Sequence, residues 1–119
     1  MKTQPIEVSV TIGKSDGHIP GNNYHDVEAR VIRKSNGRWL AVILETWGRY
    51  ACDDEEPDTS EVVGRGATLD AAAQQAEVLA AAADIKRSYL AQALSQAAME
   101  AEAEADAENQ VPQIEEKTT

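Results

Sequence analysis

Apolar and polar residues alternate strictly near the N-terminus. Residues 6–12, Ile-Glu-Val-Ser-Val-Thr-Ile, place an apolar side chain at every second position, which is the period of a strand with one buried face. Residues 27–34 and 38–50 predict two further strands. The Asn36-Gly37 pair between them predicts a two-residue hairpin turn, because both residue types tolerate positive φ. Residues 61–64 predict a short fourth strand.

The predicted two-residue turn assigns the side chains of the second and third strands to two faces. It pairs Val31 with Val42 and Ala29 with Leu44. One face is therefore predicted to be core, and its members are Val27, Ala29, Val31, Leu40, Val42 and Leu44. The opposite face is unusually apolar for a solvated surface and holds Trp39, Ile43 and Trp47. These three are candidate partner contacts, since tryptophan is enriched in interface hot spots; the alternative is that the end of a long helix covers them.

A long helix is predicted after the fourth strand. Thr68 is a suitable N-cap, and Asp70 lies in the first turn, where the helix dipole favours an acid. Apolar residues then repeat at helical spacing from Leu69 to at least Met99, without a Gly or Pro. Such a helix would be roughly 45 Å long at 1.5 Å per residue. Either it breaks near residues 86–88, or its far end packs on something other than the sheet.

These elements predict one α+β domain over residues 1–108, in which an antiparallel sheet of three or four strands is packed by one long C-terminal helix. Hydrophobic residues make up 42% of the chain, but Phe is absent and Ala supplies much of that share, so a thin core is expected. Residues 100–108 alternate acids with alanine, and residues 109–119 predict a disordered acidic tail.

The charge of the chain is uneven. Residues 1–50 carry seven Lys/Arg and five Asp/Glu, a net charge of +2, whereas residues 51–119 carry four Lys/Arg and sixteen Asp/Glu, a net charge of −12. Direct binding of nucleic acid by the second half is disfavoured, because phosphates would repel it. The same charge would attract a basic protein surface. No signal-peptide pattern and no run of about 18 apolar residues is found, so a cytoplasmic protein is expected and no membrane contact.

The sequence Cys-Asp-Asp-Glu-Glu-Pro-Asp at residues 52–58 concentrates acids in one predicted loop. Carboxylates bind hard cations, but the loop lacks the alternating spacing of a calcium site and Pro57 interrupts it. A solvated acidic loop that faces a protein partner is the favoured interpretation. The partner-binding candidates in it are Asp53, Asp54, Glu55, Glu56 and Asp58.

No catalytic or metal-binding set is predicted. His18 and His25 lie near acids, but their spacing matches no known ligand pair. Cys52 has no basic neighbour in sequence to activate its thiol. The sequence therefore predicts a protein that is not an enzyme and that has no cofactor and no metal.

The sequence Gly-Arg-Gly-Ala-Thr-Leu-Asp at residues 64–70 and the helix after it resemble HicB-like antitoxin domains. Those domains run a small antiparallel sheet into a helix that starts with a Gly-x-Thr-x-x-x-Ala pattern; the matching residues here are Gly66, Thr68, Leu69, Ala72 and Ala76. The match covers about a quarter of the chain. The Pro-Gly-Cys segment usual in that family is absent, and no DNA-binding domain follows. The resemblance implies a domain that masks a partner protein, as in toxin–antitoxin pairs.

The sequence therefore predicts a non-enzymatic acidic protein that binds and inhibits or regulates a protein partner. A basic, nucleic-acid-binding surface is the expected target, with the acids standing in for phosphate charge. A phage or mobile-element inhibitor, anti-CRISPR-like or antitoxin-like, would have this form. The alternative is a homodimeric structural or assembly protein that uses the tryptophan face and the surplus helix for self-association.

Overall fold

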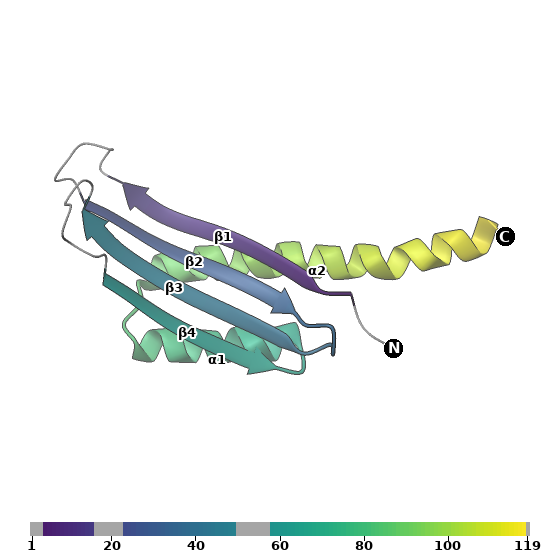
Figure 1. The fold of residues 1–119 in the computed structure, drawn as a ribbon, viewed down its shortest axis with the longest axis horizontal. Coiled ribbons are helices and arrows are strands. Elements are labelled where there is room, and N and C mark those ends of the chain that lie inside the picture. Colours follow the sequence, from purple (N-terminus) through teal and green to yellow (C-terminus); the bar gives the residue numbers. More distant parts are fainter. Residues whose placement is uncertain (1–3, 16–22, 50–57, 119) are drawn as a thin grey trace.

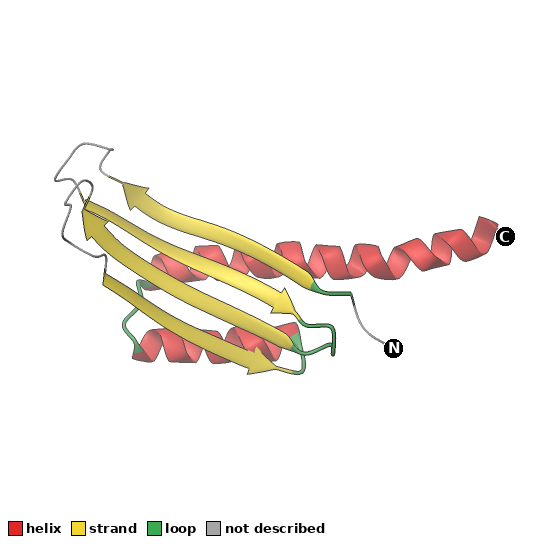
Figure 2. Cartoon of the chain, viewed as in Figure 1, coloured by secondary structure: helices red, strands yellow, loops and turns green. Residues whose placement is uncertain are grey.

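The fold is a four-stranded antiparallel sheet with two helices on one of its faces (Figures 1 and 2). The computed structural model describes residues 4–15, 23–49 and 58–118. The strands lie in sequence order across the sheet, and both helices follow the last strand. The bounds are β1 Ile6–Ser15, β2 Asn23–Arg33, β3 Trp39–Arg49, β4 Asp58–Gly66, α1 Leu69–Ala82 and α2 Arg87–Thr118. The predicted α+β fold is confirmed, and the fourth strand is longer than expected.

Each helix covers one half of the sheet. α1 packs on β4 and β3, and α2 packs on β1 and β2. Thr68 caps α1 as predicted, since its Oγ1 accepts a hydrogen bond from the Ala71 N–H at 3.1 Å. The backbone of α2 continues to Thr118, through the segment predicted as a tail. The predicted boundary between a domain over residues 1–108 and a disordered tail over residues 109–119 stays a prediction. Neither described helix combines the length and the apolar character needed to cross a membrane.

The single long helix of the sequence prediction is two helices, separated by residues 83–86 close to the expected break. Asp84 has a φ of 58°. Its N–H donates to Ala81 O at 3.2 Å, and the Ile85 N–H donates to Ala80 O at 3.0 Å. This pair of bonds is the Schellman helix end, which satisfies the last carbonyls of α1. Ile85 is then buried against the sheet side, so the chain turns back to begin α2.

The register between β2 and β3 differs by one residue from the predicted register. The structure pairs Arg33 with Trp39 and Ala29 with Ile43. The Gly37 N–H donates to Lys34 O, and the Lys34 N–H donates to Arg38 O, both at 2.9 Å. Gly37 alone in this turn has positive φ, at 87°. The connection is therefore a three-residue turn with a bulge at Gly37, and not a two-residue turn, which needs positive φ at both central positions.

This shift moves every β3 side chain to the face opposite the predicted one. Trp39, Ala41 and Ile43 lie in the core under the helices, together with Val27, Ala29 and Val31 of β2. Leu40, Val42 and Leu44, which were predicted as core, lie on the face of the sheet that no helix covers. The prediction for the β2 side chains is confirmed, and the prediction for the β3 side chains is wrong.

Small residues set the distance between the helices and the sheet. Ala72, Ala76 and Ala80 of α1 are fully buried, as are Ala93, Ala97 and Ala101 of α2. A Cβ added at Gly64 of β4 would collide with Ala72 O and Ala76 N, and would lie 2.9 Å from the Ala76 Cβ. Gly64 therefore permits α1 to lie directly on the β4 backbone.

We expect the Gly64→Ala variant to lose about 1–3 kcal/mol of unfolding free energy, because the added methyl group must push α1 away from β4. Urea denaturation followed by circular dichroism measures this loss. The matched control is Thr59→Val, an exposed position of the same strand, which should change the value by no more than about 0.5 kcal/mol. Equal stability of the two variants would contradict the close contact.

Candidate partner-binding surfaces

The candidate residues named from the sequence separate in the structure. Trp39 is 9% exposed and Ile43 is fully buried, both beneath the helices. The helix layer covers them, so the prediction that they form a contact face is wrong. Trp47 lies on the same face at the end of β3 and is 49% exposed. Asp58 begins β4, is exposed and is the register partner of Trp47. Asp53, Asp54, Glu55 and Glu56 lie outside the described residues.

Glu45 is a buried carboxylate at the centre of a polar cluster near the end of the sheet. It is 4% exposed. Its Oε2 accepts a hydrogen bond from His25 Nε2 at 2.7 Å and one from the Lys86 backbone N–H at 3.0 Å. Burial raises the pKa of the Glu45 carboxyl, but hydrogen bonds from Lys86, His25 and Trp47 outweigh that effect. The pKa therefore lies below its ordinary value of 4.5.

Aromatic rings surround this carboxylate. The His25 ring stacks on Trp47, with centroids 3.6 Å apart and an interplanar angle of 15°. Tyr89 of α2 lies 5.1 Å from the His25 ring, and Lys86 Nζ lies 4.2 Å from the Tyr89 ring. The cluster joins β2, β3, the α1–α2 connection and the first turn of α2. Glu45 thus fixes the connection between the helices onto the sheet.

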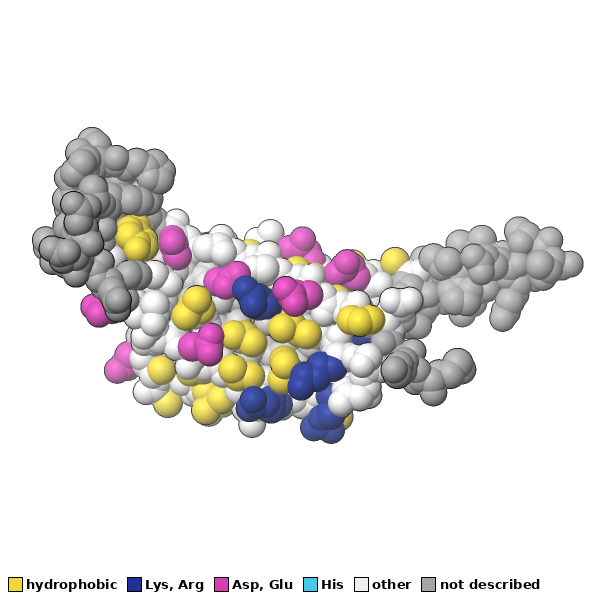
Figure 3. All heavy atoms as spheres, viewed as in Figure 1, with side chains coloured by type: hydrophobic (Ala, Val, Ile, Leu, Met, Phe, Trp, Pro, Cys, Tyr) yellow, Lys and Arg dark blue, Asp and Glu magenta, His cyan; other side chains and the backbone are white. Residues whose placement is uncertain are grey.

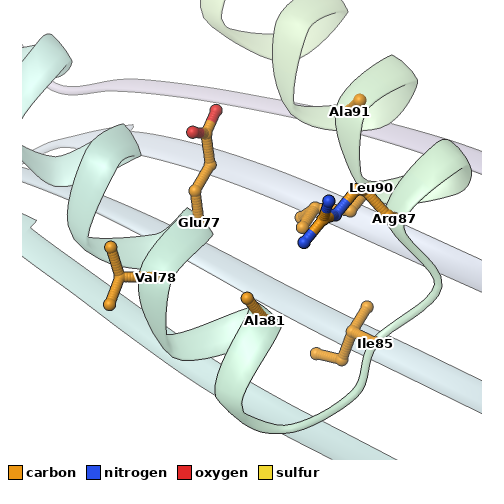
Figure 4. A pocket seen from close by; sticks show the side chains of 7 residues that line it. All are labelled: Glu77, Val78, Ala81, Ile85, Arg87, Leu90 and Ala91. Carbon is orange, nitrogen blue, oxygen red and sulfur yellow. The ribbon is translucent and has the colours of Figure 1, made fainter.

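A hollow of about 350 Å³ opens between the two helices beside this connection (Figure 4). Val78 and Ala81 of α1, Ile85 of the connection and Leu90 of α2 form its apolar lining. Val78 is 68% exposed. Charged side chains from both helices also line it, and these are Glu77 and Arg87. The hollow has the size and lining to accept an apolar side chain of a partner.

The helix layer as a whole is acidic. Residues 69–107 carry seven Asp/Glu and two Lys/Arg, and all nine side chains are exposed. By contrast, residues 4–15, 23–49 and 58–68, which contain the strands, carry six Asp/Glu and seven Lys/Arg. The excess negative charge of the described chain therefore belongs to the helix layer.

The second face of the sheet, which we call the open face, carries no helix and has an apolar middle (Figure 3). Its apolar side chains are all partly exposed, and they are Ile32, Leu40, Val42, Leu44 and Val63. Antiparallel sheets with one solvated face usually carry polar side chains on that face. The open face is therefore a second candidate for contact with a protein.

Within the described parts of the chain, no three His, Cys, Asp or Glu side chains come together as a metal site would require. His18 and Cys52 lie outside those parts. His25, which precedes the strand predicted over residues 27–34, lies in β2 and is the hydrogen-bond partner of Glu45.

Sequence reasoning missed the cluster around Glu45. The available signal was a single acid between the apolar residues Ile43 and Trp47 at alternate positions of one strand. Under the observed register that acid falls on the core face, where a charge is retained only with partners.

Comparisons of the chain with protein-family models, with curated proteins and with solved structures found no match.

We expect Glu45→Gln to lower the unfolding free energy by about 1–3 kcal/mol at pH 7, because charge-assisted hydrogen bonds are lost. The folded-state pKa of Glu45 is depressed, so the stabilisation is complete above the unfolded value of 4.5 and is lost as pH falls through the folded value. Urea denaturation at several pH values should show the difference between wild type and variant shrinking below about pH 4.5.

The matched control for this measurement is Glu102→Gln, an exposed acid of α2. It should change the unfolding free energy at pH 7 by no more than about 0.5 kcal/mol. A wild-type advantage over Glu45→Gln that stays constant from neutral to acid pH would contradict the depressed pKa.

Proposed function

We propose that the protein is a non-enzymatic cytoplasmic regulator that binds another protein through its helix layer and blocks a basic, nucleic-acid-binding surface of that partner. The observation that carries this proposal is the apolar hollow between α1 and α2, in a helix layer that carries an excess of exposed acids. An apolar hollow with a charged surround is the usual composition of a protein-binding site, in which an anchor residue enters the hollow and charges surround it.

The charge of the helix layer indicates the chemistry of the partner. Residues 69–107 carry seven exposed acids and only two exposed bases. A basic surface that binds nucleic acid is arranged to receive closely spaced negative charges. The acids of α2, which follow one another at residues 100, 102, 104 and 106, would supply such charges without phosphate. Electrostatic attraction would speed the encounter, and the hollow would supply the apolar contact.

An inhibitor carried by a phage or mobile element, anti-CRISPR-like or antitoxin-like, would act in this way. The resemblance to HicB-like antitoxin domains stays a prediction. The residues that carry it also have packing roles in this fold, so their presence does not by itself indicate that family. Thr68 caps α1, and Ala72 and Ala76 are buried against β4. A Cβ at Gly66 would lie 2.8 Å from Ala72 N. A strand that meets a helix at this distance requires small residues in any family.

The proposal is tested by capture of a partner from a nuclease-treated lysate of the host, with wild-type protein and two variants. Val78→Lys places a cation in the hollow, and Met99→Lys places the same cation on α2 outside the hollow. The two residues are matched in exposure, at 68% and 67%, so both variants should fold. We expect Val78→Lys to weaken binding about tenfold or more and Met99→Lys to weaken it much less.

The captured partner must meet two further conditions. It should leave the protein when salt is raised from about 50 to about 500 mM, because the screening length falls severalfold. Its binding to an oligonucleotide should be inhibited by the wild-type protein and not by Val78→Lys. Salt-resistant binding would refute the electrostatic contact, and equal binding by the two lysine variants would refute the hollow as the site that anchors the partner.

A further inference from the structure

We propose that the open face of the sheet binds a second copy of this chain, so that two sheets stack face to face about a two-fold axis. The helix layers of both copies then face outward. This inference does not depend on the proposed function, because the helix layer and the open face lie on opposite sides of the sheet.

The apolar middle of the open face is continuous across three strands. Val42 of β3 is the register partner of Val63 of β4, and Leu40 is the register partner of Ile32 of β2. Leu44 extends the row along β3. The opposite side of β3 is also apolar, with Trp39, Ala41 and Ile43 in the core. A strand that is apolar on both faces is typical of strands covered on both sides.

Charged residues flank this apolar middle in a self-complementary arrangement. On β4, Glu61 precedes Val63 by two residues and Arg65 follows it by two, so all three side chains point to the open face. Glu61 and Arg65 are both exposed. Within the described residues, neither side chain takes part in an ion pair of its own chain. In Figure 3, Lys and Arg side chains gather at the lower right of this face, toward the β2–β3 hairpin, and a further basic group lies in the upper middle among Asp and Glu side chains.

A two-fold axis along the row that joins Val63 to Val42 brings these opposite charges together. Such an axis lies in the plane of the interface and reverses the strand direction, so each residue faces the one equally far on the other side of the row. Arg65 of one copy then faces Glu61 of the other, and Leu40 faces Leu44. Val42 and Val63 each meet their own equivalent. Each ion pair occurs twice in the dimer, as an isologous interface requires.

On β2, Arg30 is the register partner of Val42, so it lies on the same row and faces its own equivalent, but its charge is compensated by acids of its own chain. The Arg30 guanidinium lies 3.5 Å from Glu28 and 4.0 Å from Glu7 within its own chain. The contact is centred on β3 and β4, because Leu40, Val42, Leu44 and Val63 and the Glu61 and Arg65 charges lie there.

The test is a charge exchange at the two facing positions. The variants are Arg65→Glu, Glu61→Arg and the double variant that carries both changes. Sedimentation equilibrium over a concentration series measures the dissociation constant of the species with twice the 12.9 kDa chain mass. Each single variant places like charges opposite one another at two symmetric contacts, so we expect about a tenfold or larger weakening. The double variant reverses both pairs and should return to within about threefold of the wild type.

Several results would overturn the proposal. A wild-type protein that is monomeric at about 100 μM excludes the dimer, and a double variant as weak as the single variants excludes the facing of Glu61 and Arg65. If the wild type is monomeric and Val42→Lys abolishes partner capture, the open face belongs to a different protein. Circular dichroism of the Arg65→Glu, Glu61→Arg, double and Val42→Lys variants is the control for folding.

The same experiments distinguish failure of this inference from failure of the proposed function. Val78→Lys lies on the helix layer and should leave the dimer dissociation constant unchanged. Arg65→Glu lies on the open face and should leave partner capture in place.

Discussion

The conformation of the β2–β3 connection determines which face of the sheet every β3 side chain occupies. Gly37, at a φ of 87°, allows a bulged three-residue turn that pairs Arg33 with Trp39. A register one residue away would send Trp39 and Ile43 to solvent and bring Leu40 under the helices. It would also expose Glu45, which would then no longer hold the connection between α1 and α2. The core, the polar cluster and the open face therefore depend on one turn.

Close contact between small residues explains why a core without Phe is sufficient here. Gly64 lets α1 lie on the β4 backbone, and fully buried alanines bring both helices near the sheet. Because each helix covers a different pair of strands, the two helices touch each other little. The hollow remains between them. It lies beside the α1–α2 connection, which Glu45 holds on the sheet by accepting a hydrogen bond from the Lys86 N–H. The packing that stabilises the fold thus also creates the candidate binding site.

The sequence was sufficient to predict the elements but not the contacts between them. Alternation identified the strands, and Thr68 identified the start of α1, because both signals are local. The Asn36-Gly37 pair is compatible with two turns of different register, and nothing local distinguishes them. The end of α1 was hidden because Asp84 occupies the position where glycine is usual. The partners of Glu45 come from distant residues, so the buried cluster emerged only with the fold.

The helix layer and the open face differ in charge, and this difference determines which partner each surface can bind. The helix layer carries acids in excess, so two copies would repel each other there, and only a basic partner is attracted. The strands carry nearly equal numbers of both signs, and the open face sets Glu61 and Arg65 on either side of an apolar row. Opposite charges on one face favour a copy of the same face turned by 180°. Self-association through the sheet would leave both acidic layers accessible, and each dimer would present two of them to basic partners.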